Sequence, residues 1–212
     1  KSCEQAAKLF ELSEAGNIYT RLQNPTTTAY EQRIAALYGA VGALAVSSGM
    51  SAILVTVLSL AAEGDNIVAS PFLYGGTYNQ FRITLRRLGI DCRIAPGERP
   101  EDFEALIDER TKAIYAESMG NPSCAVPDLE ELGRLARRRD VPLVVDNTFG
   151  AAGYLHKSGP GKLFENLVCK GLGDQLPLRR LRRCTALPIP QGAQQAQGII
   201  GFAGNHSRST PF

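Results

Sequence analysis

The chain has 212 residues, of which 44% are hydrophobic and 21% charged, as is typical of a globular protein with one well-buried domain. No apolar run approaches the roughly 18 residues of a membrane-spanning helix, and no basic and apolar leader opens the chain, so we expect neither a membrane partner nor a secretory signal. The five cysteines are scattered and lack CxxC spacing, which argues against a disulfide framework and a metal site and indicates a reducing cytoplasm.

The first predicted elements have the order helix, strand, turn, helix. Thr28 has capping-box spacing to Glu31, so we expect a helix from Thr28 to about Tyr38, ended by Gly39. An apolar strand over 42–46 follows, and Ser47-Ser48-Gly49 then form a turn into a helix from Met50 to about Ala62. A strand, a tight turn and a helix N-terminus in this order are typical of phosphate-binding sites.

The alternation of helix and strand continues to residue 155. Asp128 has capping-box spacing to Glu131, and Arg137–Arg139 fall in the last turn of that helix, where positive charge suits the dipole. The other expected elements are a strand at 67–69, a helix at 75–88, a strand at 90–95, a helix at 101–108, and strands at 112–116 and 141–145. This order predicts an α/β fold with a mostly parallel sheet covered by helices on both faces.

The character of the chain changes near residue 156. Residues 1–155 carry 15 Lys and Arg against 19 Asp and Glu, whereas residues 156–212 carry 8 against 2. We therefore expect an N-terminal arm (1–27), a domain (28–155) and a basic tail rich in Pro and Gln (156–212), for which we consider disorder or translation in a shifted reading frame. No aromatic residues interleave Arg179–Arg183, which favours a solvated tail over a nucleic-acid partner.

A carboxylate and a helix N-terminus are the first candidate site residues. Asp146 stands at the carboxyl end of a predicted parallel strand, where it either caps the following turn or binds a ligand. Ser48, Gly49 and Met50 offer the unpaired N–H groups of a helix N-terminus, and Gly49 lets an anion approach the backbone closely. The pair suggests one ligand with a basic ring nitrogen at one end and a phosphate at the other.

Two further polar or aromatic groups end the strands between them. Tyr74 follows the strand at 67–69 and either stands at the site or packs over a loop, and Asn121 follows the strand at 112–116. Ligands of open α/β sheets bind outside the carboxyl ends of the strands, so we expect Gly49, Tyr74, Asn121 and Asp146 to converge there. Neither GxGxxG nor GK[ST] follows a strand here, which disfavours a nicotinamide cofactor and a P-loop.

Together these residues resemble the pyridoxal-phosphate enzymes of cysteine and methionine metabolism, the trans-sulfuration enzymes, over about residues 6–155. The segments 17–25 and 146–155 look most similar to the O-acetylhomoserine sulfhydrylase branch. The resemblance implies the large domain of a fold-type I PLP-dependent transferase, truncated on its C-terminal side, with residues 28–155 binding the cofactor.

The resemblance also implies a role for each site residue. Ser48, Gly49 and Met50 would bind the phosphate of pyridoxal 5'-phosphate, Tyr74 would stack on its ring, Asn121 would lie beside the ring, and Asp146 would pair with the protonated ring nitrogen. Tyr19 and Arg21 of the arm would reach the phosphate of a neighbouring subunit. Because a lone subunit would then have an incomplete site, the resemblance implies a homodimer or homotetramer.

The implied reaction converts the amino-acid substrate O-acetylhomoserine and sulfide to homocysteine and acetate. In such an enzyme a lysine forms a Schiff base with the cofactor and then moves protons while acetate leaves and sulfide adds at the γ-carbon. The family's Ser-x-Thr-Lys motif does not occur here. The candidate lysine is Lys170, which lies 24 residues after Asp146 and is followed by Gly171; with Tyr74 it is a candidate catalytic residue. Lys157 and Lys162 lie closer to Asp146 in the sequence. Lys112 is expected on the surface. The alternatives are a catalytically inactive fragment, or a related lyase or transferase that uses another nucleophile.

Overall fold

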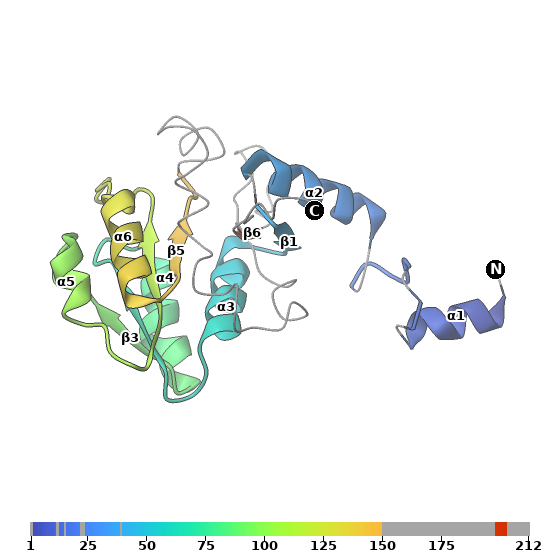
Figure 1. Ribbon diagram of the computed structural model, residues 1–212, viewed down its shortest axis with the longest axis horizontal. Coiled ribbons are helices and arrows are strands. Elements are labelled where there is room, and N and C mark those ends of the chain that lie inside the picture. The colour runs from blue at the N-terminus through green and yellow to red at the C-terminus, as the bar shows by residue number, and fades with distance from the viewer. Residues whose placement is uncertain are drawn as a thin grey trace, which may run out of the picture.

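The computed structural model of the chain describes residues 2–149, except 12, 15, 22, 23 and 39, together with the backbone of 198–202. An N-terminal arm carries helix α1 (Cys3–Phe10) and leads into helix α2 (Pro25–Tyr38). The arm projects away from the rest of the molecule, which is an α/β body (Figure 1). No helix in the described part of the chain is long and apolar enough to cross a membrane.

The body is built on four parallel strands in the order β3-β2-β4-β5. Their bounds are β2 (Asn66–Ala69), β3 (Asp91–Ile94), β4 (Thr111–Glu117) and β5 (Leu143–Asp146). Because the strands are parallel, their carboxyl ends share one edge of the sheet. This edge is where the sequence predicts the site.

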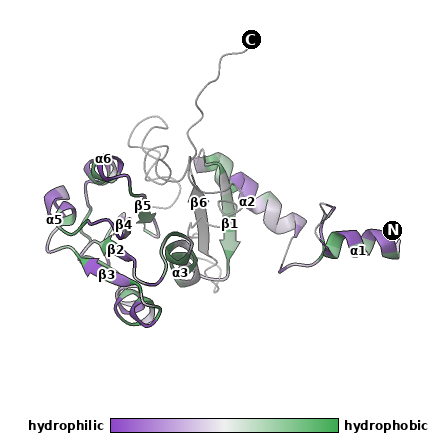
Figure 2. Cartoon of the chain, turned by 60° about the horizontal axis from the view of Figure 1, so that its bottom comes forward, coloured by the Kyte–Doolittle hydropathy of each residue, from purple (hydrophilic) through white to green (hydrophobic). Residues whose placement is uncertain are grey.

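Helices cover both faces of this sheet, as predicted (Figure 2). Alternate residues of β2 and β4 enter two separate cores, with Ile67 and Tyr115 in one and Val68 and Ile114 in the other. The first core is closed by α3 (Gly49–Leu60), α4 (Gly75–Asn79) and the π-helical segment η1 (Gln80–Leu85), the second by α5 (Pro100–Glu104) and α6 (Leu129–Arg139). The α/β fold class is therefore confirmed.

Strand β1 (Gly42–Val46) has the bounds that the sequence predicts, but it does not join the parallel sheet. It pairs antiparallel with β6 (Gly198–Phe202), in a register that sets Gly42 opposite Phe202 and Val46 opposite Gly198. Helix α2 packs against β1, and the Glu31 carboxylate accepts the N–H of Ala45 at 2.7 Å. These contacts connect the arm side of the molecule with the turn that opens α3.

The predicted start of the first helix is wrong. Helix α2 begins at Pro25 rather than at Thr28, because the Asn24 side chain accepts the N–H of Thr26 at 2.9 Å and Pro25 suits the first turn. Glu31, expected in a capping box, instead binds the backbone of β1.

The start of α6, in contrast, is confirmed. Asp128 accepts the N–H groups of Glu130 and Glu131, as the capping-box spacing predicts. Arg137–Arg139 fill the last turn, also as predicted, and Asp140 ends the helix in the left-handed region with φ of 54°. The single helix expected over 75–88 divides into α4 and η1, and α5 is shorter than predicted.

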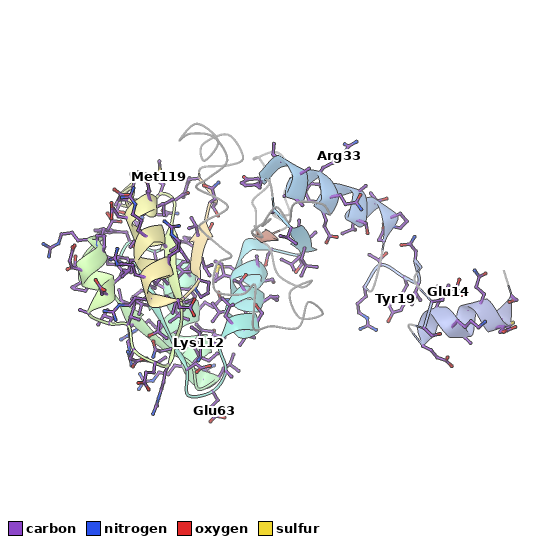
Figure 3. All side chains as sticks on the ribbon, in the orientation of Figure 1. Glu14, Tyr19, Arg33, Glu63, Lys112 and Met119 are labelled. Carbon is purple, nitrogen blue, oxygen red and sulfur yellow. The ribbon has the colours of Figure 1, made fainter. Side chains whose placement is uncertain are left out.

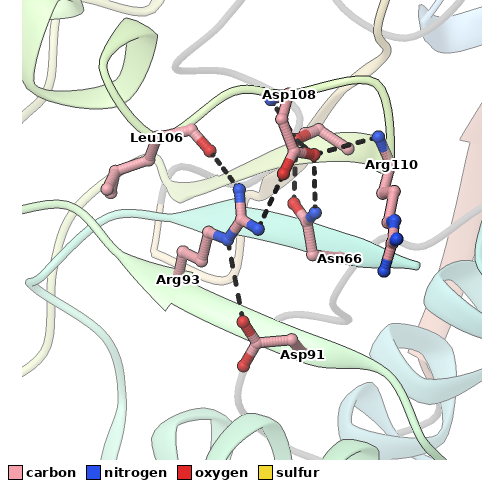
Figure 4. A network of polar contacts seen from close by, with 7 residues as sticks. Asn66, Asp91, Arg93, Leu106, Asp108 and Arg110 are labelled. Carbon is pink, nitrogen blue, oxygen red and sulfur yellow. Dashed lines mark hydrogen bonds and ion pairs between the residues drawn. The ribbon is translucent and has the colours of Figure 1, made fainter. Parts of the chain in front are cut away.

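A polar network fixes the edge of the sheet opposite to the predicted site (Figure 4). Arg93 on β3 pairs with Asp108 at 2.7 Å and donates to the carbonyl oxygen of Leu106 at 2.8 Å. The Asn66 amide donates to Asp108 at 2.9 Å, and these partners hold the pKa of the Asp108 carboxyl well below its usual range. The network therefore ties β2 and β3 to the loop that leads into β4.

Candidate functional site

Two carboxylates stand next to each other at the carboxyl edge of the sheet. Glu117 ends β4 and Asp146 ends β5, and the two residues are Cα partners in the parallel register. The next residue, Ser118, donates its N–H to the carbonyl oxygen of Asp146 at 2.9 Å. The backbone of the two strands thus fixes the spacing of the acidic groups.

Asp146 forms the following turn, which is one of the two roles that its sequence position allows. Its Oδ1 accepts the N–H of Thr148 at 2.9 Å and also the Thr148 hydroxyl, which is the local turn that an Asp in this position forms. Its Oδ2 faces the Tyr115 hydroxyl at 3.4 Å, a long hydrogen bond. The turn therefore orients the carboxylate through one oxygen, and the weakly bound Oδ2 keeps capacity for a ligand.

Tyr115 lies directly beneath the two carboxylates. Its ring packs edge-on against Phe81, with 4.8 Å between the ring centroids, and its side chain is fully buried. Burial, together with the charges of Asp146 and Glu117, raises the pKa of the Tyr115 hydroxyl well above its ordinary value. The hydroxyl is therefore a proton donor at physiological pH, and it donates toward Asp146.

Glu117 is a site residue that the sequence argument did not assign. It is only 5% exposed, and its Oε1 accepts the backbone N–H of Tyr74 at 2.7 Å. Burial raises the pKa of the carboxyl to about 7; the bound N–H groups of Tyr74 and Asn121 act in the opposite direction, and Asp146 raises it further. A charged residue ending an otherwise apolar strand was the available signal.

Tyr74 is the residue before the first turn of α4, and its side chain is half exposed. Its ring lies over Gly76, where an added Cβ would sit 2.4 Å from the ring carbon Cε1. Gly76 is therefore needed for the position of the ring. With the backbone held by Glu117, an aromatic face is presented beside the carboxyl ends of β2 and β4.

The start of α3 has the properties of an anion site. Ser48 caps the helix, since its hydroxyl accepts the N–H of Ser51 at 3.1 Å, and Met50 accepts the Gln80 side-chain amide at 3.1 Å through its carbonyl oxygen. Among the described residues, no atom lies within 4 Å of a Cβ added at Gly49, so this part of the chain leaves open space at the turn. Gln80, from η1, ties the turn to the segment that carries Tyr74.

The loop after β4 brings Asn121 to the same edge. Gly120 lies so close to Phe72 that an added Cβ would be 2.7 Å from the Phe72 Cβ and 2.8 Å from its carbonyl oxygen. Asn121 follows, and its backbone N–H lies close enough to the Glu117 carboxyl to lower the pKa of that group. The Ser118 hydroxyl is buried and has no hydrogen-bond partner among the described residues. The strand ends that carry Tyr74, Asn121 and Asp146 are therefore linked by direct contacts.

The two arm residues lie elsewhere. Tyr19 is on the arm, well away from the body (Figure 3), where the Arg21 guanidinium contacts its hydroxyl and lies 5.1 Å from its ring centroid. The Phe10 ring stacks against Tyr19, with 6.4 Å between the ring centroids. Within one subunit, the structure thus does not bring Tyr19 and Arg21 to Asp146. Their contact with the cofactor phosphate of a neighbouring subunit stays a prediction.

The lysines of the described part lie away from the site. Lys112 stands at the opposite end of β4 from Met119 (Figure 3) and pairs with Asp65 at 3.6 Å, while Lys8 pairs with Glu4 on α1. The surface position expected for Lys112 is confirmed. The candidate Lys170, like Lys157 and Lys162, lies outside the described residues.

Comparison with known proteins identifies the family to which this chain belongs. The model of the "Cys/Met metabolism PLP-dependent enzyme" family matches residues 1–158. The chain belongs to this family. The resemblance on which the sequence argument rested is confirmed.

Curated relatives and a solved structure agree with this assignment. The chain is 55% identical over 156 residues to O-acetyl-L-homoserine sulfhydrylase 1 of Thermus thermophilus, covering 73% of this chain and 37% of that protein. It is 53% identical over 151 residues to homocysteine/cysteine synthase of Kluyveromyces lactis, covering 71% and 34%. A putative O-acetylhomoserine (thiol)-lyase from Campylobacter jejuni, solved with a pyridoxyl-lysine phosphate group, matches with a TM-score of 0.67 and 38% identity, over 72% of this chain and 37% of that one.

This chain thus spans about one third of the length of these relatives. The described residues fit pyridoxal phosphate in three respects. Open space in front of the Gly49 turn suits a phosphate, the Asp146 carboxylate suits a protonated ring nitrogen, and the half-exposed ring of Tyr74 suits stacking. In the described part of the chain, no group of three or more His, Cys, Asp or Glu could hold a metal ion.

Proposed function

We propose that this chain carries the cofactor-binding part of a PLP-dependent transferase that converts O-acetylhomoserine and sulfide to homocysteine and acetate. One observation carries the proposal: the Asp146 carboxylate and the Tyr74 ring lie at the carboxyl ends of the parallel strands, and Gln80 ties the N-terminus of α3 to the segment that carries Tyr74. The names of the two sulfhydrylase and synthase relatives support the choice of substrates.

Each residue has a defined task in this proposal. Pyridoxal phosphate, when bound, supplies an electron sink for negative charge that develops next to the amino group of the substrate. Asp146 holds a proton on the ring nitrogen by a charge-assisted hydrogen bond, and the Thr148 turn fixes its orientation. The N–H groups at Gly49 and Met50 bind the phosphate, and Ser48, whose hydroxyl is engaged with Ser51, holds the turn in shape.

The protein groups that flank the cofactor ring come from the loops after β2 and β4. Tyr74 covers the ring with its exposed aromatic face and so keeps water from it, and Asn121 contributes its amide beside the ring. Both loops are held by the same buried carboxylate of Glu117. The protein therefore orients the cofactor mainly through backbone-fixed groups.

The proposed assembly is a homodimer or homotetramer. Phe10 and Tyr19 are large, exposed aromatic residues on an arm that projects from the body, and Arg21 lies beside Tyr19. An arm of this kind would complete the phosphate site of a second copy with a hydroxyl and a guanidinium group. We place this assembly in the cytoplasm, because the cysteines of the described part, Cys3, Cys92 and Cys124, are free thiols.

A second candidate function is a cofactor-binding chain without catalytic activity. It is favoured by the positions of Lys8 and Lys112, the lysines of the described part, which both form ion pairs away from Asp146. Catalysis in this family's manner then depends on Lys170. If Lys170 does not reach the cofactor, the chain binds it without a covalent bond.

Borohydride trapping separates the two candidates. The purified chain is incubated with pyridoxal phosphate, reduced, digested and analysed by mass spectrometry, and homocysteine formation is measured in parallel. A phosphopyridoxyl group on Lys170, lost in Lys170→Ala together with activity, is the result expected for the transferase. Reversible cofactor binding without a labelled lysine at the site would instead establish the inactive binder.

A further inference from the structure

Glu117 has contacts that its position in the core does not require. A carboxylate that is 5% exposed is costly to bury unless hydrogen bonds compensate for lost water. An apolar residue of the same size would end β4 at lower cost. The N–H of Tyr74 donates to the carboxylate at 2.7 Å, and the N–H of Asn121 is a second, weaker backbone donor that lowers the pKa of the group.

These two donors belong to different loops. Tyr74 is the residue before the first turn of α4, where N–H groups have no partner within the helix, and Asn121 lies in the loop that follows β4. One side chain at the end of the central strand β4 therefore sets the distance between both loops. The close approach of Gly120 to Phe72 holds the same two loops together on their other side.

We propose that Glu117 is a positioning residue that places Tyr74 and Asn121 around the cofactor, acting through their backbone N–H groups. The inference rests on the proposed function, because it concerns the same site. We call the contacts of Glu117 with the backbone N–H groups of Tyr74 and Asn121 the Glu117 bracket. Because the strand register sets Glu117 opposite Asp146, this bracket lies next to the carboxylate that would pair with the ring nitrogen. Loss of the bracket lets the Tyr74 ring leave its place over Gly76 and weakens stacking on the cofactor.

Two substitutions distinguish hydrogen bonding from mere filling of space. Glu117→Leu keeps the volume and removes the acceptor, whereas Glu117→Gln keeps a carbonyl oxygen that can accept the N–H of Tyr74. Glu98 offers a matched control, because it is another glutamate whose pKa is raised by burial, and its buried Oε1 has no hydrogen-bond partner among the described residues. Glu98→Gln and Glu98→Leu therefore test the effect of removing a half-buried carboxylate elsewhere.

Amide hydrogen exchange, measured by NMR on the full chain without cofactor, reports directly on the backbone N–H groups of Tyr74 and Asn121 that contact Glu117. We expect slow exchange at Tyr74 and Asn121 in the wild type and in Glu117→Gln, and exchange faster by roughly tenfold or more in Glu117→Leu. Unchanged exchange in Glu117→Leu would overturn the inference. If Glu117→Leu does not fold, the wild type decides, because fast exchange at Tyr74, equal to that of Gly75, would also overturn it.

Titration with pyridoxal phosphate then tests the consequence. We expect the dissociation constant to rise by roughly tenfold in Glu117→Leu, to recover in Glu117→Gln, and to stay unchanged in both Glu98 variants. Equal affinity of Glu117→Leu and wild type contradicts the positioning role. A wild type that binds no pyridoxal phosphate would contradict the proposed function alone, since the exchange rates still decide whether the bracket exists.

Discussion

Glu117 and Asp146 end adjacent parallel strands as Cα partners, and Glu117 is the buried member of the pair. Burial raises the pKa of Glu117 to about 7, and the neighbouring Asp146 adds to the effect. The Asp146 carboxylate is half-buried, and the turn at Thr148 fixes its orientation. A buried carboxyl group with a raised pKa beside a second acidic group is a common sign of a functional site.

The raised pKa of Glu117 predicts a pH-dependent stability. Because the folded chain binds this proton more tightly than the unfolded chain, the free energy of unfolding falls as the pH rises from about 4.5 to about 7. Glu117→Gln removes this dependence, so the variant should exceed the wild type by at most about 3 kcal/mol above about pH 7. The difference should shrink below about pH 4.5. Urea unfolding across this pH range measures it, and a constant difference would contradict the assignment.

Gly76→Ala should weaken cofactor binding by displacing the Tyr74 ring. The added Cβ would meet the ring at 2.4 Å, and the ring is the part that can move. We expect roughly tenfold weaker binding of pyridoxal phosphate with no loss of thermal stability, because Ala favours a helix over Gly. Gly75→Ala is the control, since a Cβ there meets nothing within 4 Å. Equal effects of the two substitutions would rule out displacement of the ring.

Gly49→Ala separates the stability of α3 from its anion site. The added methyl meets no atom within 4 Å, so the fold should tolerate it and the helix gain up to about 1 kcal/mol. The methyl enters the space that we assign to the phosphate, and pyridoxal phosphate should bind at least about tenfold more weakly. Gly133→Ala in α6, with its nearest atom 3.8 Å away, should stabilise the chain without weakening binding. Unchanged affinity in Gly49→Ala would place the phosphate elsewhere.

Mixing two defective variants tests whether the arm serves a neighbour. Arg21→Ala removes the arm cation, and Asp146→Ala removes the carboxylate of the body. If the arm completes a second copy's site, a refolded equimolar mixture of dimers should regain about one quarter of the high-affinity sites. If the arm folds back onto its own subunit, the mixture should stay as weak as the separate variants in the same titration.

The central strands and α6 were predictable because local and tertiary signals agree. The runs at 42–46 and 67–69 have the apolar composition and the short length of buried strands, and Asp128 both caps α6 and stands at the right spacing from Glu131. The start of α2 was not predictable, because Asn24 and Thr28 are both good N-caps. The choice between them depends on Glu31, whose carboxylate accepts the N–H of Ala45 instead of completing a capping box with Thr28. The π-helical turn of η1 leaves no distinct pattern in six residues.

Some residues of the candidate site were likewise predictable from the sequence, and others were not. The positions of Asp146 and Tyr74 were predictable because Asp146 ends β5 and Tyr74 lies in the loop after β2, and a parallel sheet gathers such positions at one edge. Gly49 follows β1, which pairs with β6 outside that sheet, so the parallel order alone does not place it. The role of Glu117 was not predictable, because it depends on backbone donors from two loops, which no spacing in the sequence reveals. The same holds for the contact of Gln80 with Met50, which joins segments 30 residues apart.

The most direct test of the whole account is an equilibrium titration of the full chain with pyridoxal phosphate, comparing wild type with Asp146→Asn. Asn keeps the size and an oxygen for the Thr148 turn, but it lacks the charge that would hold a protonated ring nitrogen. We predict saturable binding by the wild type and a dissociation constant roughly 10-fold to 100-fold higher in the variant, as expected for loss of a charge-assisted hydrogen bond. Equal affinities, or no binding by the wild type, would contradict the assignment of this edge as a pyridoxal-phosphate site.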